Sequence, residues 1–359
     1  MVECLFLKDK ALYNSAIFSS HKSLLVGRVF KEGKHYNGLL IDEDKKVGII
    51  VEGGEDISLY SVRECKDKYV AVGHKGRRTF VIFYRRDSGD VLALIGPEGI
   101  LWQTDCALAV GGYEKDGWQL LLFDIKRNRT LTFSSGENMY AYSFKKALKG
   151  YVVVGRVGWE GNYDGFVLWL DRNLKPLKTL RTNWGGNDYL RYTDGRWAVG
   201  RIEMKEDSEG LLIDLKSLKA FAYRRQGFDY FRYIHPTKNL IMGEAEDEDT
   251  VRKALVVYGH KGQLIGDGFS AIRFYDAKSK RAYGYMYMGK FAYAIRIKKP
   301  FGNTFFYNIQ ALRFRWRDYK LLPTKGSIGF EPIRISSFNV FYEWKDCEAI
   351  KGLKNFEED

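Results

Sequence analysis

Short apolar segments that end in a small-residue step recur along the whole chain. In each step a large apolar or aromatic residue precedes a glycine, and eight steps occur: Val26-Gly27, Val72-Gly73, Val110-Gly111, Val154-Gly155, Val199-Gly200, Met242-Gly243, Tyr283-Gly284 and Ile328-Gly329. Neighbouring glycines lie 38 to 46 residues apart. Regular spacing of this length is the signature of a repeat architecture. The pattern therefore predicts eight copies of one structural unit.

Each unit is expected to contain four short strands. About 15 residues after most of the glycines an apolar strand ends, often at an aspartate: Asp42, Asp124, Asp171 and Asp214. Aspartate suits a tight turn because its carboxylate accepts hydrogen bonds from the backbone N–H groups just ahead of it. A third short strand follows, a fourth precedes each glycine, and no stretch has a helical period. This pattern predicts a four-stranded antiparallel blade.

A single blade of this size cannot bury both faces, but blades stacked in a ring can. We therefore expect residues 1–359 to form one all-β domain, a β-propeller of eight blades. The repeat over residues 311–352 is the least regular, so the alternative is seven blades plus a C-terminal extension. We expect the N-terminal strand, residues 2–7, to complete the last blade and close the ring.

The repeat unit resembles the Kelch-like group of propeller repeats. In that group a strand ends in a glycine step, an apolar strand ends in Tyr-Asp or a similar pair, and a last strand closes the blade. Gly111-Gly112 matches the double glycine of the family. The resemblance implies a rigid platform that binds partners through its loops, with occasional enzymes among the members.

Charge and cysteine content bear on partner and compartment. The chain has 58 Lys+Arg against 45 Asp+Glu, a formal net charge of +13, which favours an acidic partner. The first ten residues have no basic and apolar signal-peptide pattern, and no apolar run is long enough to span a membrane. Four widely spaced cysteines predict reduced, structural thiols. We expect a cytoplasmic monomer.

Candidate ligand-binding residues emerge when the innermost strands are aligned. Four consecutive units carry an apolar-Arg-aromatic triplet, which places Arg191, Arg232, Arg273 and Arg313 at matching positions. The matching positions of the other units are uncharged: approximately Asn14, Ser61, Gln103 and Ser143. The alignment predicts a central channel that is cationic along one arc and neutral along the other.

Two interpretations of these arginines stay open. Guanidinium groups suit the bidentate capture of phosphate or carboxylate, and several in one concave site would focus a strong field. Alternatively, each arginine forms a structural ion pair with a nearby acid, such as Asp188 or Asp229. We include both aspartates among the candidate site residues.

A second set of candidates could bind a macromolecule. Trp159, Tyr163 and Trp184 lie in or near long loops, where large aromatic side chains make good anchors. Arg315 and Arg317 flank Trp316, and alternating basic and aromatic residues are typical of single-stranded nucleic-acid binders. Ordinary propeller turns and half-buried strands show the same patterns, so this alternative stays open too.

The function expected from the sequence is a non-catalytic binding platform. It would bind an acidic protein or a nucleic-acid-containing assembly through loops around the channel mouth. The alternative is an enzyme or small-molecule binder that holds an anionic ligand on the arginine arc. The five histidines and four cysteines lack metal-ligand spacing, so no metal or cofactor is predicted.

Overall fold

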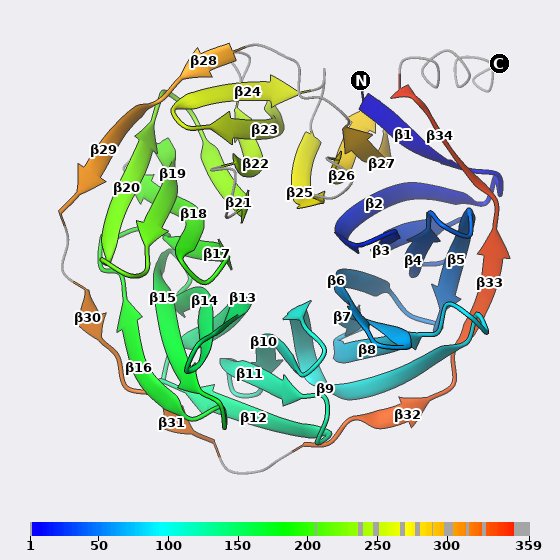
Figure 1. The fold of residues 1–359 in the computed structure, drawn as a ribbon, viewed down its shortest axis with the longest axis horizontal. Coiled ribbons are helices and arrows are strands. Elements are labelled where there is room, and N and C mark those ends of the chain that lie inside the picture. Colours follow the sequence, from blue (N-terminus) through cyan, green and yellow to red (C-terminus); the bar gives the residue numbers. More distant parts are fainter. Residues whose placement is uncertain are drawn as a thin grey trace.

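The fold consists of strands arranged around a central axis (Figure 1). The computed structural model describes residues 2–204, 207–235, 240–246, 251–265, 270–276, 281–288, 290–297, 304–313, 316–324 and 328–347. These ranges contain 34 β-strands, and Cys347 is the one described residue with helical geometry. The predicted all-β class is confirmed. None of the described residues belongs to a helix long and apolar enough to cross a membrane.

Seven four-stranded units follow one another around the ring in Figure 1. Unit 1 contains β2 (Leu12–His21), β3 (Leu24–Lys31), β4 (Tyr36–Asp42) and β5 (Val47–Glu52). Unit 2 contains β6 (Ile57–Cys65), β7 (Lys68–Lys75), β8 (Arg78–Tyr84) and the first half of β9 (Val91–Thr104). Unit 3 contains the second half of β9, β10 (Leu108–Glu114), β11 (Trp118–Asp124) and β12 (Arg129–Ser134). The long strand β9 thus joins two units into one sheet.

The remaining four units repeat this plan. Unit 4 contains β13 (Asn138–Ala147), β14 (Gly150–Trp159), β15 (Asn162–Asp171) and β16 (Pro176–Arg181). Unit 5 contains β17 (Tyr189–Thr193), β18 (Trp197–Met204), β19 (Asp207–Asp214) and β20 (Lys219–Arg224). Unit 6 contains β21 (Asp229–His235), β22 (Leu240–Glu246), β23 (Arg252–Tyr258) and β24 (Lys261–Ile265). Unit 7 contains β25 (Ser270–Asp276), β26 (Arg281–Met288), β27 (Phe291–Ile297) and the N-terminal strand β1 (Val2–Leu7).

The hydrophobic core lies between the units. Among the described residues there are seven clusters of buried apolar side chains, each formed by two neighbouring units. One cluster joins unit 7 to unit 1 through Leu5, Ala294 and Leu39. The predicted pairing of the N-terminal strand with the last unit is therefore confirmed, although that unit is the seventh.

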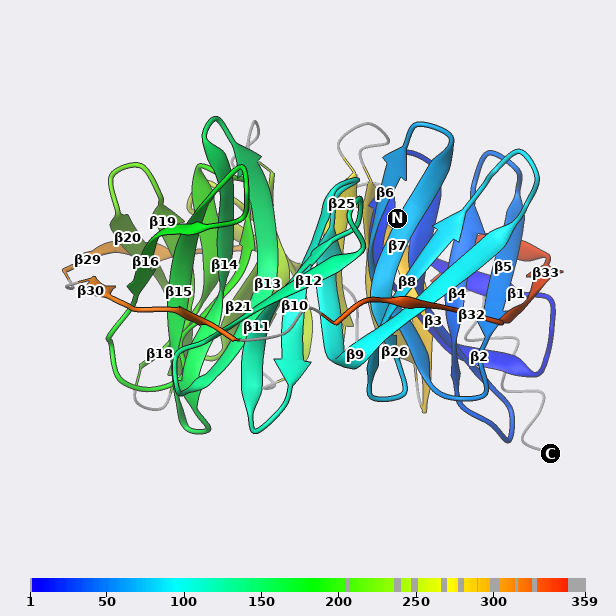
Figure 2. The same ribbon diagram turned by 90° about the horizontal axis from the view of Figure 1, so that it is seen from below.

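A C-terminal belt runs around the outside of the ring and adds a fifth strand to every unit (Figures 1 and 2). We define the belt by its strands: β28 (Thr304–Phe306), β29 (Asn308–Leu312), β30 (Arg317–Asp318), β31 (Leu322–Pro323), β32 (Glu331–Ile333), β33 (Ser336–Val340) and β34 (Tyr342–Asp346). They pair antiparallel with β24, β20, β16, β12, β9, β5 and β1 in that order. The belt thus visits the units in reverse, from unit 6 to unit 1 and then unit 7.

The belt corrects the predicted eighth blade. Residues 311–352 were expected to form a unit of their own, but their described part is spread along the edges of six units. The chain at Ile328 and Gly329 forms no inner hairpin. Instead, Ile328 exchanges hydrogen bonds with the Thr130 side chain, which holds this segment against β12.

The cysteine prediction is also wrong, because all four cysteines form disulfides. Cys4 of β1 is bonded to Cys347, which follows β34. Cys65 at the end of β6 is bonded to Cys106 in the turn before β10. The sequence did not reveal either pair, because the paired cysteines are far apart in the chain. They come together only when the fold brings the two ends of the chain, and the turns of units 2 and 3, next to each other. The argument for a reducing compartment is thereby lost.

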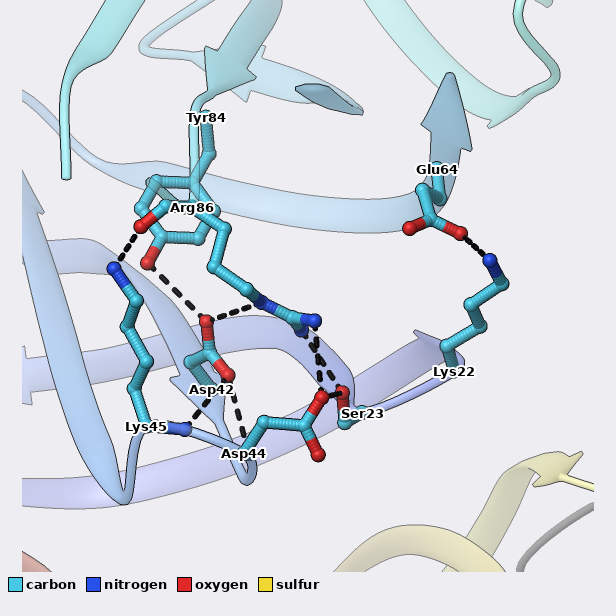
Figure 3. Close-up of polar contacts among 8 residues, drawn as sticks. All are labelled: Lys22, Ser23, Asp42, Asp44, Lys45, Glu64, Tyr84 and Arg86. Atoms are coloured by element: carbon cyan, nitrogen blue, oxygen red, sulfur yellow. Dashed lines mark hydrogen bonds and ion pairs between the residues drawn. The ribbon is translucent and has the colours of Figure 1, made fainter. Parts of the chain in front are cut away.

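The predicted role of aspartate at strand ends is confirmed at the junction of units 1 and 2 (Figure 3). The Oδ1 atom of Asp42 accepts hydrogen bonds from the backbone N–H groups of Asp44 and Lys45, both at 3.2 Å. Its Oδ2 atom accepts from the Tyr84 hydroxyl at 3.2 Å and from Nε of Arg86 at 2.8 Å. One buried carboxylate therefore closes a turn and ties two units together.

Candidate functional site

A cavity of about 430 Å³ lies at the centre of the ring and is lined mainly by the innermost strands. Its shape depends on a β-bulge that recurs in every unit. In each innermost strand, one residue is left out of the pairing register next to the repeat glycine. A bulge redirects its side chain relative to the strand. The seven bulge residues all line the cavity: Phe18, Tyr60, Trp102, Tyr142, Arg191, Arg232 and Arg273.

The repeat glycine makes this bulge possible. A Cβ atom on Gly73 would lie 1.7 Å from the carbonyl oxygen of Ser58, and one on Gly200 would lie 1.7 Å from that of Tyr189. A Cβ atom added to any of the other repeat glycines of units 1 to 7 would lie 1.8 to 2.0 Å from the equivalent carbonyl oxygen. No side chain fits at such a distance. The glycines found in the sequence are therefore needed where the inner strand approaches its neighbour most closely.

The cavity wall has two chemically different arcs. The aromatic arc consists of Phe18, Tyr60, Trp102 and Tyr142, on units 1 to 4, and adjacent rings are in contact. The ring centroids of Tyr60 and Trp102 are 4.4 Å apart. The arginine arc consists of Arg191, Arg232 and Arg273, on units 5 to 7. The wall thus places flat apolar rings beside a group of positive charges.

Arg191 joins the two arcs. Its Cζ atom lies 4.5 Å from the centroid of Trp102 and 4.4 Å from that of Tyr142. It forms no ion pair with any described residue. Burial, with repulsion from Arg232 and Arg273, lowers the pKa of the Arg191 guanidinium to about 10. The group is still charged at neutral pH, but it lacks the acidic partner that a half-buried arginine normally has.

The other two arginines have polar partners. Arg232 forms an ion pair of 2.5 Å with the buried carboxylate of Glu244 on β22. Burial acts to raise the pKa of Glu244, but attraction to Arg232 and then Arg273 outweighs it and keeps the pKa below its usual value. Arg273 donates to the Tyr285 hydroxyl at 2.9 Å. In both arginines the Nε atom is buried and has no hydrogen-bond partner in the described structure.

The cavity as a whole is strongly positive. Arg28 and Arg63 also line it, and neither forms an ion pair with a described residue. No aspartate or glutamate belongs to the described lining, although Glu244 stands behind Arg232. Five guanidinium groups therefore line the cavity, and within the described residues only Arg232 forms an ion pair. Such a concave, partly buried site attracts anions.

The predicted ligand-binding residues separate into two groups. Arg191, Arg232 and Arg273 meet in the cavity, whereas Arg313 lies exposed beyond the end of β29 in the belt. Asp188 and Asp229 are fully buried and do not line the cavity. Asp229 binds Arg225 at 3.0 Å and the Tyr307 hydroxyl at 2.9 Å, so it holds the belt against unit 6 and forms no ion pair with Arg191, Arg232 or Arg273.

The candidate partner-binding residues do not form one surface in the described structure. Trp159 is 56% exposed at the end of β14, whereas Tyr163 is buried. Trp184 and Trp316 are partly buried and pack against the core cluster between units 4 and 5, and the Trp316 indole donates to the Leu218 carbonyl at 3.1 Å. Arg317 lies exposed on the two-residue strand β30. Arg315 lies outside the described residues.

The aromatic arc was missed by the sequence alignment. The positions matched to the arginines were Asn14, Ser61, Gln103 and Ser143, but the equivalent bulge residues are Phe18, Tyr60, Trp102 and Tyr142. The predicted neutral arc is therefore aromatic. The bulge residue always follows the residue that pairs with the repeat glycine, and this pairing is visible only in the structure.

Comparisons with known proteins give little about function. No protein-family model matches the chain. The chain is 24% identical over 205 residues to an uncharacterised protein of Aquifex aeolicus (strain VF5). The match covers 57% of this chain and 49% of that relative, so it spans about half the length of the curated relative.

Proposed function

We propose that the chain is a seven-bladed β-propeller that binds a small anionic ligand in its central cavity. Units 1 to 7 are the blades, and the C-terminal belt supplies a fifth strand to each. The arginine arc carries this proposal: three consecutive innermost strands each turn an arginine toward the cavity, with one carboxylate among them. Among the described residues, structural ion pairing accounts for Arg232 but not for Arg191 or Arg273.

The two arcs suggest what the ligand contains. Guanidinium groups bind phosphate and carboxylate through two parallel hydrogen bonds, and Arg191, Arg232 and Arg273 line the cavity. The adjacent aromatic arc favours a flat group, since aromatic rings stack with an offset or edge to face. A volume of about 430 Å³ falls in the range of small-molecule sites. We expect an anion attached to a planar moiety.

An acidic macromolecule bound by the loops remains a weaker proposal. Its support is the net charge of +13, which acts through long-range attraction and does not specify a site. Among the aromatic anchors suggested for it, Tyr163 is buried, and Trp184 and Trp316 are partly buried against a core cluster. The cavity offers the more specific chemistry.

Calorimetry with two probes tests the proposal. Inorganic phosphate should bind weakly, and phenyl phosphate should bind more tightly because its ring adds contact with the aromatic arc. Replacing Arg191 or Arg273 with glutamine should weaken phenyl phosphate binding at least about tenfold, the effect of losing one charged hydrogen bond. Both variants should keep the wild-type circular dichroism spectrum.

The control removes the same charge elsewhere. Arg129 is exposed on β12, outside the cavity, so R129Q should bind phenyl phosphate like the wild-type protein. Equal losses in R129Q and R191Q would mean that the effect comes from net charge and would reject the cavity site. Failure of the wild-type protein to bind either probe at millimolar concentration would reject it as well.

A further inference from the structure

Two more arginines lie next to the cavity without belonging to its lining. Arg156 of β14 and Arg201 of β18 each follow the repeat glycine of their unit. We call them the outer pair. The Cζ atom of Arg156 is 4.5 Å from the ring centroid of Tyr140 and 4.3 Å from that of Tyr163. Arg201 lies 5.4 Å from the centroid of Phe228. Both guanidinium groups therefore sit among aromatic rings.

Neither member of the outer pair is neutralised by a described residue. No carboxylate of the described ranges lies within ion-pair distance of Arg156 or Arg201, and the Nε atom of each is buried without a hydrogen-bond partner. Other arginines of the same two units behave differently, because Arg181 binds Asp164 and Arg224 binds Glu209. Partly buried positive charges without an acidic neighbour attract anions, so the outer pair calls for an anionic partner.

Shared tyrosine rings connect the outer pair to the arginine arc. Tyr142 lies under both Arg191, at 4.4 Å, and Arg156, at 5.8 Å. Tyr230 lies under both Arg232, at 4.1 Å, and Arg201, at 5.6 Å. Tyr189 in turn contacts Arg156 and Arg201. Four arginines and three tyrosines thus form one continuous array that leads from the cavity to the outer pair.

We propose that the outer pair is a second anion subsite and that the natural ligand carries two anionic groups. This inference rests on the proposed function, since the first group would bind the arginine arc. The second phosphate or carboxylate would bind Arg156 and Arg201, and the planar part of the ligand would lie along the tyrosines between them. Stacking of bases on aromatic rings and guanidinium planes beside phosphate contacts is the chemistry by which proteins hold short nucleotides.

Two commercially available nucleotides test this inference because they differ by one phosphate group. Adenosine 5′-monophosphate should occupy the arginine arc alone, whereas adenosine 3′,5′-bisphosphate should reach both subsites. By calorimetry the wild-type protein should bind the bisphosphate at least tenfold more tightly. R201Q and R156Q should lose this preference and keep the affinity for the monophosphate. R201K, which retains the charge, should recover part of the preference.

The variants separate the two proposals. R273Q should weaken both nucleotides equally, and R129Q should change neither. The cavity site stands if the wild-type protein binds the monophosphate and R273Q weakens that binding. The second subsite is rejected if R201Q still binds the bisphosphate tenfold more tightly than the monophosphate, or if the wild-type protein binds both nucleotides equally. If R273Q changes neither nucleotide, or neither binds the wild-type protein, both proposals are rejected. Urea unfolding curves for R156Q, R201Q and R201K establish which of these variants are folded under the conditions of calorimetry, and the binding data of those variants test the second subsite.

Discussion

Asp188 shows how a single buried acid is tuned by its surroundings. The side chain is completely buried at the edge of unit 5. Its Oδ1 atom accepts a hydrogen bond from the Glu203 backbone N–H at 3.3 Å, while Oδ2 has no partner in the described structure. Burial, reinforced by the nearby carboxylates of Asp164 and Glu203, raises the pKa of Asp188 to about 8. The folded protein therefore retains this proton at neutral pH.

This raised pKa sets the direction of a stability change with pH. The unfolded chain releases the Asp188 proton near pH 4, so between about pH 4 and pH 8 the folded state binds one more proton. Stability contributed by this group must fall as pH rises through that window and level off above pH 8. An asparagine side chain at this position cannot titrate. We expect the unfolding free energy of D188N relative to the wild-type protein to be about 4 kcal/mol larger at pH 9 than at pH 5, measured by urea unfolding.

The same variant distinguishes a structural role from a ligand-binding role. Asp188 was a candidate site residue, yet it does not line the cavity. D188N should therefore bind phenyl phosphate with wild-type affinity. Parallel pH profiles of stability for the two proteins would contradict the assigned titration, and a changed affinity would return Asp188 to the site.

At the scale of the element, every unit repeats an inner hairpin whose first strand contains a β-bulge. Gly73 provides the test, because a Cβ atom added there would lie only 1.7 Å from the Ser58 carbonyl oxygen. G73A must push the two strands apart and should lower the free energy of unfolding by about 3 kcal/mol. Gly329 has nothing within 4 Å of an added Cβ, so G329A should stay within about 0.5 kcal/mol of the wild-type value.

Urea unfolding followed by tryptophan fluorescence measures both variants. Gly329 is a matched control because the sequence pattern gave it the same repeat position as Gly73. If G73A and G329A are equally stable, the glycine is not required by the bulge. The bulge would then need another cause.

The same hairpin explains what the sequence could and could not predict about the site. The glycine steps located the inner hairpins of units 1 to 7, and the aligned triplets found Arg191, Arg232 and Arg273. The aromatic arc was missed because the bulge residue precedes its glycine by nine residues at Phe18 and by thirteen at Tyr60. The turn length differs between the units. Only the pairing register, which depends on hydrogen bonds, shows that these positions are equivalent.

At the scale of the whole molecule, the C-terminal belt covers the outer edge of each unit. Exposed strand edges invite pairing with other chains, and here β28 to β34 occupy them in turn. The sequence could not reveal this arrangement, since each belt strand has two to five residues and pairs with a strand far away in the chain. The regular spacing of Gly329 from Gly284 made the belt resemble one more repeat.

The two disulfides constrain the unfolded chain to different extents, which gives a whole-molecule prediction. The Cys4–Cys347 bond joins residues 343 positions apart and fastens the end of the belt to β1, whereas the Cys65–Cys106 bond spans 41 positions. Loop-closure entropy grows with the logarithm of loop length, so the longer loop should contribute about 2 kcal/mol more to stability. Reductant therefore should destabilise C65A/C106A, which keeps the long loop, more than C4A/C347A, which keeps the short one.

Comparing each double variant with and without reductant leaves its side chains unchanged, so differences in packing cancel. Urea unfolding should show a loss on reduction about 2 kcal/mol larger for C65A/C106A than for C4A/C347A. Equal losses would mean that the belt end is held by strand pairing and burial of Cys4 and Cys347 and not by the covalent link. A larger loss of unfolding free energy for C65A/C106A would show that the Cys4–Cys347 disulfide stabilises the belt around all seven units.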